Sequence, residues 1–164
     1  MLVLCLGFGV AVLDQLTKHL TQANIPYGHQ VPIIPGFFSL SHVHNTGAAW
    51  GMLQGYNRWL IGLSFVMLGM VIAFRRHFLV GSRLAHVAAG LILGGIVGNL
   101  VDRVRLGYVV DFLDFLLWGY PFPSFNIADS SICIGVGLYM VTQFKSQEHV
   151  MSNPNASSPE NLQA

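Results

Sequence analysis

The fold is decided by one apolar stretch, LAHVAAGLILGGIVGNLV, which extends from Leu84 to Val101. Its length is close to the roughly 20 apolar residues that a helix needs to cross a bilayer. Four glycines lie along it, namely Gly90, Gly94, Gly95 and Gly98. Because glycine has no side chain to hold two helices apart, we expect a membrane-spanning helix that packs closely against its neighbours.

Three further runs resemble this stretch in length and polarity. The predicted spans are about 2–20, 59–74, 84–101 and 127–144. The second is short, but Trp59 begins it and Arg75 and Arg76 follow it, and aromatic and basic residues anchor a span at the membrane boundary. A secretory signal peptide at Leu2–Leu13 is the weaker interpretation, because no basic residue precedes the run and no small-x-small cleavage site follows it.

The composition agrees with a membrane protein. Of 164 residues, 53% are hydrophobic and only 9% are charged, whereas an average soluble domain carries roughly 25% charged residues. The net charge of +1, without basic blocks among aromatic residues, argues against a nucleic-acid partner. We expect a membrane all-α fold, a four-transmembrane-helix bundle in residues 1–145. The polar stretch 146–164, rich in Ser, Asn and Pro, predicts a disordered cytoplasmic tail.

Basic residues set the expected orientation. Arg75, Arg76 and Arg83 fill the connection between the second and third spans, and short loops rich in Lys and Arg remain in the cytoplasm. Both termini are then cytoplasmic. Arg103 and Arg105 fall on the outer side, against this rule, and we attribute the exception to a local partner, the adjacent Asp102.

The two outer segments predict further structure. Residues 37–44, FFSLSHVH, alternate partly in the manner of a strand, which predicts a small extracytoplasmic β element. Residues 107–125 are dense in Phe, Trp and Tyr, which suit the membrane interface. We expect this second segment to be an interfacial loop or helix along the outer surface.

Carboxylates in or beside a bilayer are costly and are therefore candidates for function. Asp14 has Lys18 one helical turn further on, so an ion pair explains it as well as function does. For Asp102, its basic neighbours favour a structural role. Three acids have no Lys or Arg within four residues, and all three are expected at the outer boundary: Asp111, Asp114 and Asp129.

Two such carboxylates brought together would share one proton, as in an aspartic protease. One carboxylate then activates a water molecule while its protonated partner stabilises the oxyanion. Alternatively, the acids cap helices, since Asp129 begins the fourth span and Asp111 precedes an aromatic run that a surface helix would also explain. The charges alone leave both interpretations open.

Other chemistries have weaker support. The sequence has no Gly-x-Ser-x-Gly, no His-Glu-x-x-His and no phosphate-binding loop that ends in Gly-Lys-Ser/Thr. His42 and His44 lie on one strand face and are possible metal ligands, but without a third ligand nearby, polar packing is the favoured interpretation. We therefore expect no metal.

Five motifs give the chain a specific resemblance. In chain order they are DQLTK (residues 14–18), NTGAAWG (45–51), GGIVGNLVDR (94–103), VVDF (109–112) and FNIADS (125–130). In these motifs and in their order the chain resembles lipoprotein signal peptidase, also called signal peptidase II. Ile96, Val97 and Trp50 differ from residues common in the family and concern packing only.

The resemblance implies a membrane aspartic endopeptidase of the bacterial inner membrane, with its active site on the periplasmic side. It implies removal of signal peptides from prolipoproteins, before a cysteine that carries a diacylglyceryl group. Asp111 and Asp129 would be catalytic, without a metal or cofactor. Separately, we expect a monomer that contacts prolipoproteins and membrane lipids. The residues expected to support the site are Asp14, Lys18, Asn45, Gly47, Ala48, Asn99, Asp102, Arg103, Asn126 and Ala128.

Two other classes remain as alternatives, a small proton-coupled membrane transporter and a non-catalytic membrane scaffold. A proton relay would place acids at several depths along a path, whereas the unpaired acids here gather at one level. A presenilin-type protease would carry Gly-x-Gly-Asp, which is absent.

Overall fold

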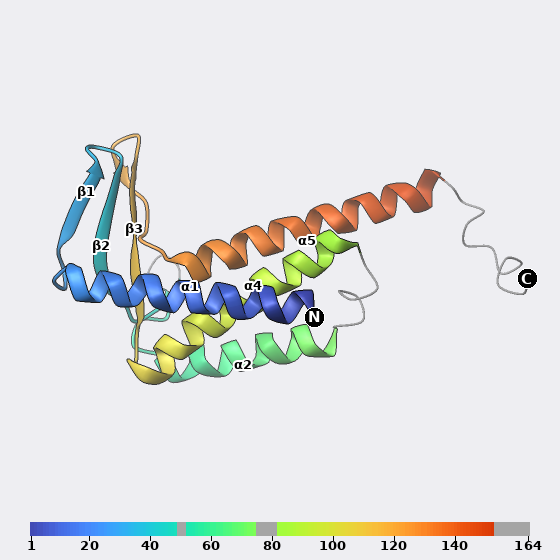
Figure 1. Ribbon diagram of the computed structural model, residues 1–164, viewed down its shortest axis with the longest axis horizontal. Coiled ribbons are helices and arrows are strands. Elements are labelled where there is room, and N and C mark those ends of the chain that lie inside the picture. Colours follow the sequence, from blue (N-terminus) through green and yellow to red (C-terminus); the bar gives the residue numbers. More distant parts are fainter. Residues whose placement is uncertain (49–51, 75–81, 153–164) are drawn as a thin grey trace, which may run out of the picture.

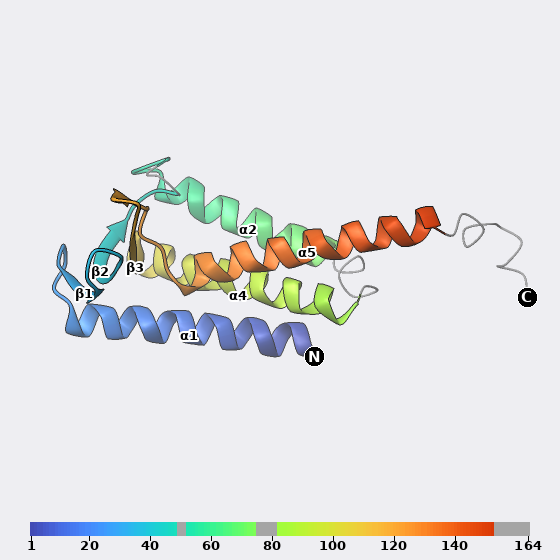
Figure 2. The same cartoon turned by 90° about the horizontal axis from the view of Figure 1, so that it is seen from above.

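The computed structural model describes residues 1–48, 52–74 and 82–152. Its helices are α1 (Leu2–Asn24), α2 (Asn57–Ala73), α4 (Arg83–Arg105) and α5 (Ile127–Ser152). A four-stranded antiparallel sheet stands across one end of these helices (Figures 1 and 2). Its strands, in spatial order, are β1 (Gln30–Ile34), β2 (Phe38–Asn45), β3 (Val109–Leu117) and β4 (Tyr120–Pro121).

Three helical segments are long and apolar enough to cross a membrane, namely Leu2–Asn24, Arg83–Arg105 and Ile127–Phe144. The fourth predicted span corresponds to α2, an apolar helix of 17 residues that is shorter than these three. Among the described residues the fold is therefore of a membrane type, with apolar helices and a small antiparallel sheet. Arg75 and Arg76, predicted to anchor α2, lie outside the described residues.

Helix α4 is the most buried of the long helices and lies between α1 and α5. A side chain on Gly94 would meet the backbone of Gly7 in α1. One on Gly95 would meet the carbonyl oxygen of Ala128 in α5. The glycines that the sequence singled out thus allow two close helix contacts on different sides of α4.

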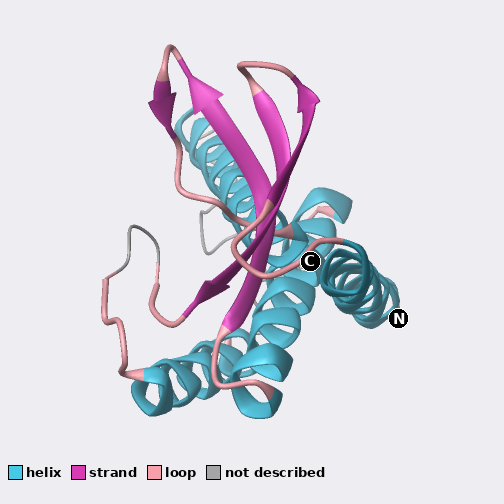
Figure 3. Ribbon diagram, turned by 90° about the vertical axis from the view of Figure 1, so that its left-hand side faces the viewer, coloured by secondary structure: helices cyan, strands magenta, loops and turns pink. Residues whose placement is uncertain are grey.

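The expected interfacial loop or helix in residues 107–125 was wrong, because this segment forms the hairpin of β3 and β4. Its first strand pairs with β2 along most of its length, so the sheet is larger than the segment around β2 alone predicts (Figure 3). Trp118 and Gly119 turn the hairpin with φ angles of 51° and 83°. Asp111 accordingly lies within a strand and does not cap a helix.

The predicted tail, 146–164, begins as helix, since α5 continues to Ser152. Residues 153–164 lie outside the described part of the chain. Elsewhere the helices present apolar side chains outward, such as Leu4 and Phe8 on α1, which are 72% and 74% exposed. Such faces suit lipid and not water.

Gly95→Ala is expected to lower the free energy of unfolding by about 1–3 kcal/mol, because overpacking a close contact forces the backbone to move. The new methyl group would meet the Ala128 carbonyl oxygen across the α4–α5 contact. The measurement is thermal unfolding of the purified protein in detergent. Gly137→Ala in α5 is the control, since nothing lies within 4 Å of its added carbon. Equal losses in the two variants would contradict the role of this contact.

Candidate active site

Asp111 and Asp129 open into one cavity of about 610 Å³ at the sheet end of the helices. Asp111 lies in β3 and is 1% exposed, while Asp129 lies in the first turn of α5. The third unpaired acid, Asp114, lies further along β3 and does not line the cavity. The cavity lining also includes Asn45, Thr46, Ala48, Asn99, Arg103, Phe122, Phe125, Ile132 and Cys133.

Asn126 joins the two aspartates. Its side-chain oxygen accepts a hydrogen bond from the backbone N–H of Asp129 (3.0 Å), so it caps the start of α5. Its amide nitrogen donates to Oδ1 of Asp111 (2.7 Å). Asn126 is fully buried. One asparagine therefore fixes the helix that carries one carboxylate against the strand that carries the other.

Two further asparagines contact the carboxylates. Asn45 donates from Nδ2 to Oδ2 of Asp111 (2.9 Å), and Asn99 donates from Nδ2 to Oδ1 of Asp129 (2.7 Å). Neutral amides orient the carboxylates without adding a positive charge that would hold both of them ionised. The pair is thus held in place while it remains able to share a proton.

One arginine lies in the described lining of the cavity. Arg103 lies in its lining and donates from Nη2 to the carbonyl oxygen of Gly47 (3.1 Å). A side chain on Gly47 would meet the carbonyl oxygen of Met52, which accepts from the N–H of Ala48 (2.7 Å). The loop after β2 therefore needs glycine at this position in order to reach Arg103.

A buried ion cluster lies behind the aspartates. Lys18 contacts Oδ2 of Asp14 (2.8 Å), Oδ2 of Asp102 (3.0 Å) and Oδ1 of Asn99 (3.0 Å). The three charged side chains are almost fully buried. The sequence predicted the Asp14–Lys18 pair correctly but assigned Asp102 to Arg103 and Arg105. That assignment was wrong, because Asp102 turns inward to Lys18 while Arg103 faces the cavity.

This cluster holds the backbone beside each candidate catalytic residue. Asp14 accepts a hydrogen bond from the N–H of Ala128 (2.9 Å), the residue before Asp129. Asp102 accepts one from the N–H of Val110 (3.1 Å), the residue before Asp111. The two carboxylates that neutralise Lys18 thus position the two carboxylates of the cavity.

Gln15 was missing from the site predicted from the sequence. Its side-chain nitrogen donates to Oδ1 of Asp102 (2.7 Å) and to the carbonyl oxygen of Gly98 (3.1 Å), so it links α1 to α4. The available signal was its place in DQLTK, between Asp14 and Lys18. Asn57 was also missed, and it donates to the carbonyl oxygen of Arg103 (3.0 Å).

The electrostatic setting favours a shared proton. Burial raises the pKa of Asp111, and the nearby charge of Asp129 raises it further, to about 7. The hydrogen bonds from Asn45 and Asn126 and the charge of Lys18 act in the opposite direction without cancelling these effects. Near neutral pH Asp111 is therefore partly protonated, as a carboxyl that shares a proton with a neighbouring carboxylate would be.

His42 and His44 interact with each other through their Nε2 atoms, 3.1 Å apart. His42 also contacts the carbonyl oxygen of Ile25 through Nδ1 (2.8 Å), and the ring of His44 stacks between Tyr27 and Tyr108. This is polar and aromatic packing of β2 against the C-terminal end of α1. Within the described ranges, no three His, Cys, Asp or Glu side chains are grouped so as to hold a metal ion.

Comparison with known proteins identifies relatives of the chain. The family model for signal peptidase (SPase) II matches residues 6–145. The lipoprotein signal peptidase of Symbiobacterium thermophilum is 42% identical over 138 residues, which cover 84% of this chain and 91% of that protein. The lipoprotein signal peptidase of Vibrio cholerae is 38% identical over 155 residues, 91% of this chain and 90% of that protein.

A solved structure agrees with these relatives. It is described as a bacterial membrane enzyme determined by the in meso method at 2.3 Å resolution. It superposes with a TM-score of 0.74 and 31% sequence identity, and the match covers 96% of this chain and 92% of that one. With a family model that spans most of its length and relatives near 40% identity, the chain belongs to the signal peptidase II family.

Proposed function

We propose that the chain is a membrane aspartic endopeptidase that removes signal peptides from diacylglyceryl-modified prolipoproteins, cleaving before the lipidated cysteine. Asp111 and Asp129 are its catalytic pair. The observation that carries the proposal is the position of Asn126, which donates to one carboxylate and caps the helix that bears the other. A signal peptidase II needs no further catalytic group in this mechanism.

The reaction begins with a water molecule between the two carboxylates. The ionised carboxylate takes a proton from this water as its oxygen attacks the carbonyl carbon of the scissile amide. The protonated carboxyl donates a hydrogen bond to the developing oxyanion. A proton then passes to the leaving amine as the C–N bond breaks, which leaves one proton on the pair. No metal or cofactor takes part in any step.

The supporting residues act on the pair or on the bound peptide. Asn45, Asn99 and Asn126 orient the carboxylates through the hydrogen bonds described above. Arg103 and the loop residues Gly47 and Ala48 form the part of the cavity next to β2, where a peptide backbone would bind. Phe122, Phe125 and Ile132 supply apolar surface for the lipidated part of the substrate.

We also propose that α2 completes a four-span bundle in the bacterial inner membrane. Both termini would be cytoplasmic, with residues 153–164 as a polar tail, and the sheet end would face the periplasm. The substrate's signal peptide then crosses the membrane beside the helices, and its cleavage site reaches the depth of the cavity. A monomer suffices, because both aspartates and their asparagines come from one chain.

A proton-coupled transporter and a scaffold fit the site less well. A relay needs acids at successive depths along a path. The two candidate acids instead open into one cavity, and two other acids, Asp14 and Asp102, are both paired with Lys18.

Asp111→Asn and Asp129→Asn are each expected to lower the rate of prolipoprotein cleavage by at least 10²- to 10⁴-fold, roughly the contribution of a general acid or base. Either change removes a carboxylate that must hold or accept the proton. The measurement is cleavage of a diacylglyceryl-modified prolipoprotein by purified enzyme in liposomes, with the unmodified precursor as the comparison substrate. The unmodified precursor should remain uncut.

Asp114→Asn is the matched control for this pair. It changes an acid on the same strand as Asp111 but outside the cavity, so cleavage should stay near the wild-type rate. An equal loss of cleavage activity in all three variants would contradict the assignment of Asp111 and Asp129 as the catalytic pair. Full activity of either Asp111→Asn or Asp129→Asn would contradict it as well.

The rate of cleavage should depend on pH through the pair. Because the pKa of Asp111 is raised to about 7, the shared proton is lost as the pH rises through this region, and the rate falls on the alkaline side. Protonation of both carboxyls lowers the rate on the acid side, so the profile is bell-shaped. A rate that keeps rising above neutral pH would exclude the shared proton.

Asn45→Ala should move the alkaline side of this profile to higher pH. Asn45 donates to Oδ2 of Asp111 and favours its ionised form, so its removal raises the pKa further. The measurement is kcat/KM against pH for both enzymes. A shift to lower pH, or none, would contradict the electrostatic role of Asn45.

A further inference from the structure

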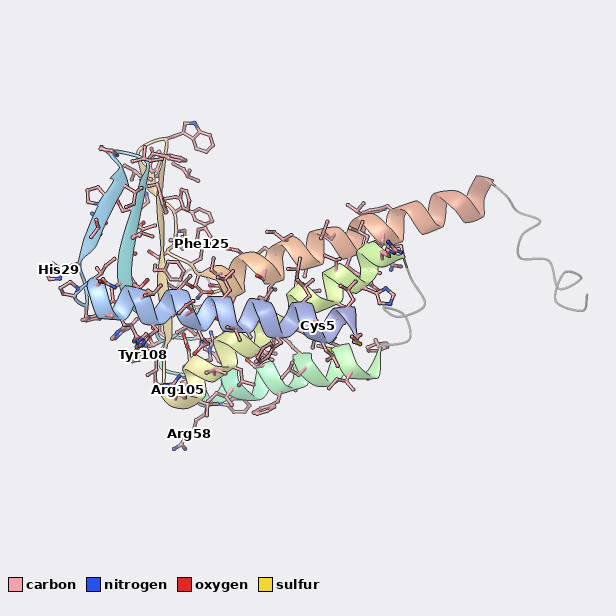
Figure 4. The ribbon with its side chains drawn as sticks, viewed as in Figure 1. Cys5, His29, Arg58, Arg105, Tyr108 and Phe125 are labelled. Atoms are coloured by element: carbon pink, nitrogen blue, oxygen red, sulfur yellow. The ribbon has the colours of Figure 1, made fainter. Side chains whose placement is uncertain are left out.

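Two exposed arginines at the sheet end of the helices take no part in the site. Arg58 lies in the first turn of α2, and Arg105 is the last residue of α4. Figure 4 labels both at the end of the bundle that carries the sheet. Basic residues are concentrated in short cytoplasmic loops, and the sheet end is the proposed periplasmic end. Arginines at the sheet end are therefore unusual, and a local anionic partner would explain them. Arg103 has a local partner, the carbonyl oxygen of Gly47, whereas Arg58 and Arg105 have none among the residues that the structure describes.

The two arginines lie on helix ends that touch. The side chain of Asn57 donates to the backbone oxygen of Arg103 (3.0 Å), which joins the first turn of α2 to the last turn of α4. Arg58 follows Asn57 directly, and Arg105 lies two positions beyond Arg103. Their flexible side chains can therefore reach a common point beside this hydrogen bond.

No carboxylate neutralises either arginine in the described part of the chain. The ion pairs found there are those of Lys18 with Asp14 and Asp102. Asp102, the acid nearest to Arg105 in sequence, also accepts hydrogen bonds from Gln15 and from the N–H of Val110. Two guanidinium groups are thus left for an anion from outside the protein.

The depth of Arg58 points to the lipid headgroups. With 17 residues, α2 is about 25 Å long, which is shorter than the hydrocarbon core of about 30 Å. A short span keeps its terminal residues at the boundary, where an arginine extends toward the phosphates. Tyr56 and Trp59, which flank Arg58, are 58% and 75% exposed, as is typical of interfacial aromatic residues.

An apolar ridge continues from this boundary along α2. Leu63, Val66 and Met70 follow Trp59 at helical spacing and are 50%, 57% and 48% exposed. Side chains at this spacing lie on one face of a helix. The face therefore offers contact to acyl chains directly below the arginines.

We propose that Arg58 and Arg105 bind the phosphate of one anionic phospholipid, whose acyl chains lie along the Trp59–Met70 ridge of α2. Guanidinium groups match phosphate geometry through paired N–H donors. A headgroup without its own cation, such as phosphatidylglycerol, retains the net negative charge that two arginines select. The bound lipid would link α2 to α4 next to Arg103, independently of the cleavage reaction.

The experiment measures lipid binding to the full chain in detergent by native mass spectrometry. Phosphatidylglycerol is expected to bind more tightly than phosphatidylcholine of the same chain length. Arg58→Gln and Arg105→Gln should each weaken phosphatidylglycerol binding roughly fivefold, the effect of about one basic residue at an anionic lipid surface. The double variant should lose less than the product of the two single losses, because both arginines hold one phosphate.

Arg83→Gln is the matched control, since it removes an exposed arginine from the other end of α4. Arg83→Gln should leave unchanged the dissociation constant of the most tightly bound phosphatidylglycerol molecule. Equal losses in Arg58, Arg105 and Arg83 variants would show general attraction of lipid to positive charge and overturn the site. Equal affinity for the two lipids, or displacement of the lipid by millimolar inorganic phosphate, would overturn it as well.

Discussion

The structure depends on the neutralisation of one buried ammonium group, that of Lys18. A charge removed from water is costly unless close partners compensate it, and Lys18 has Asp14 on its own helix and Asp102 on α4. These partners must approach closely, and a side chain on Gly98 would already meet a carboxylate oxygen of Asp14. The two carboxylates then accept backbone N–H groups from α5 and β3. One ion cluster thus connects every element that carries one of the proposed catalytic aspartates.

The helices could be predicted from the sequence because each carries a long apolar run, but β3 could not. Residues 109–112 are all buried, so this part of the strand shows no alternation of apolar and polar side chains. Its aromatic residues resemble those of an interfacial segment, and only pairing with β2 shows which structure they form. Figure 3 shows how the long strand crosses the ends of the helices, an arrangement that no local pattern contains.

Charge spacing predicted part of the site. It isolated Asp111, Asp114 and Asp129, because no basic residue is near them in sequence. It did not separate the third acid from the pair, since that distinction depends on which side chains enter the cavity. Asn126 and Gln15 carry no charge, so their contacts with several elements leave no sign in a charge pattern. Asn126 was predicted as a site residue from the FNIADS motif, whereas only the structure showed the contacts of Gln15.

The arrangement also explains how a cation close to the proposed catalytic pair is compatible with a shared proton. An unpaired lysine next to two carboxylates would favour the ionised form of both. In the described part of the chain Lys18 makes no direct ion pair with Asp129. Asn99 lies between them, accepts a hydrogen bond from the ammonium and donates one to the carboxylate. The charge of Lys18 is compensated by Asp14 and Asp102 on the other side. Asn99 therefore fixes the position of the Asp129 carboxylate relative to Lys18. Asp14 and Asp102 reduce the electrostatic effect of Lys18 on the pair, so that the pair can hold one proton at neutral pH.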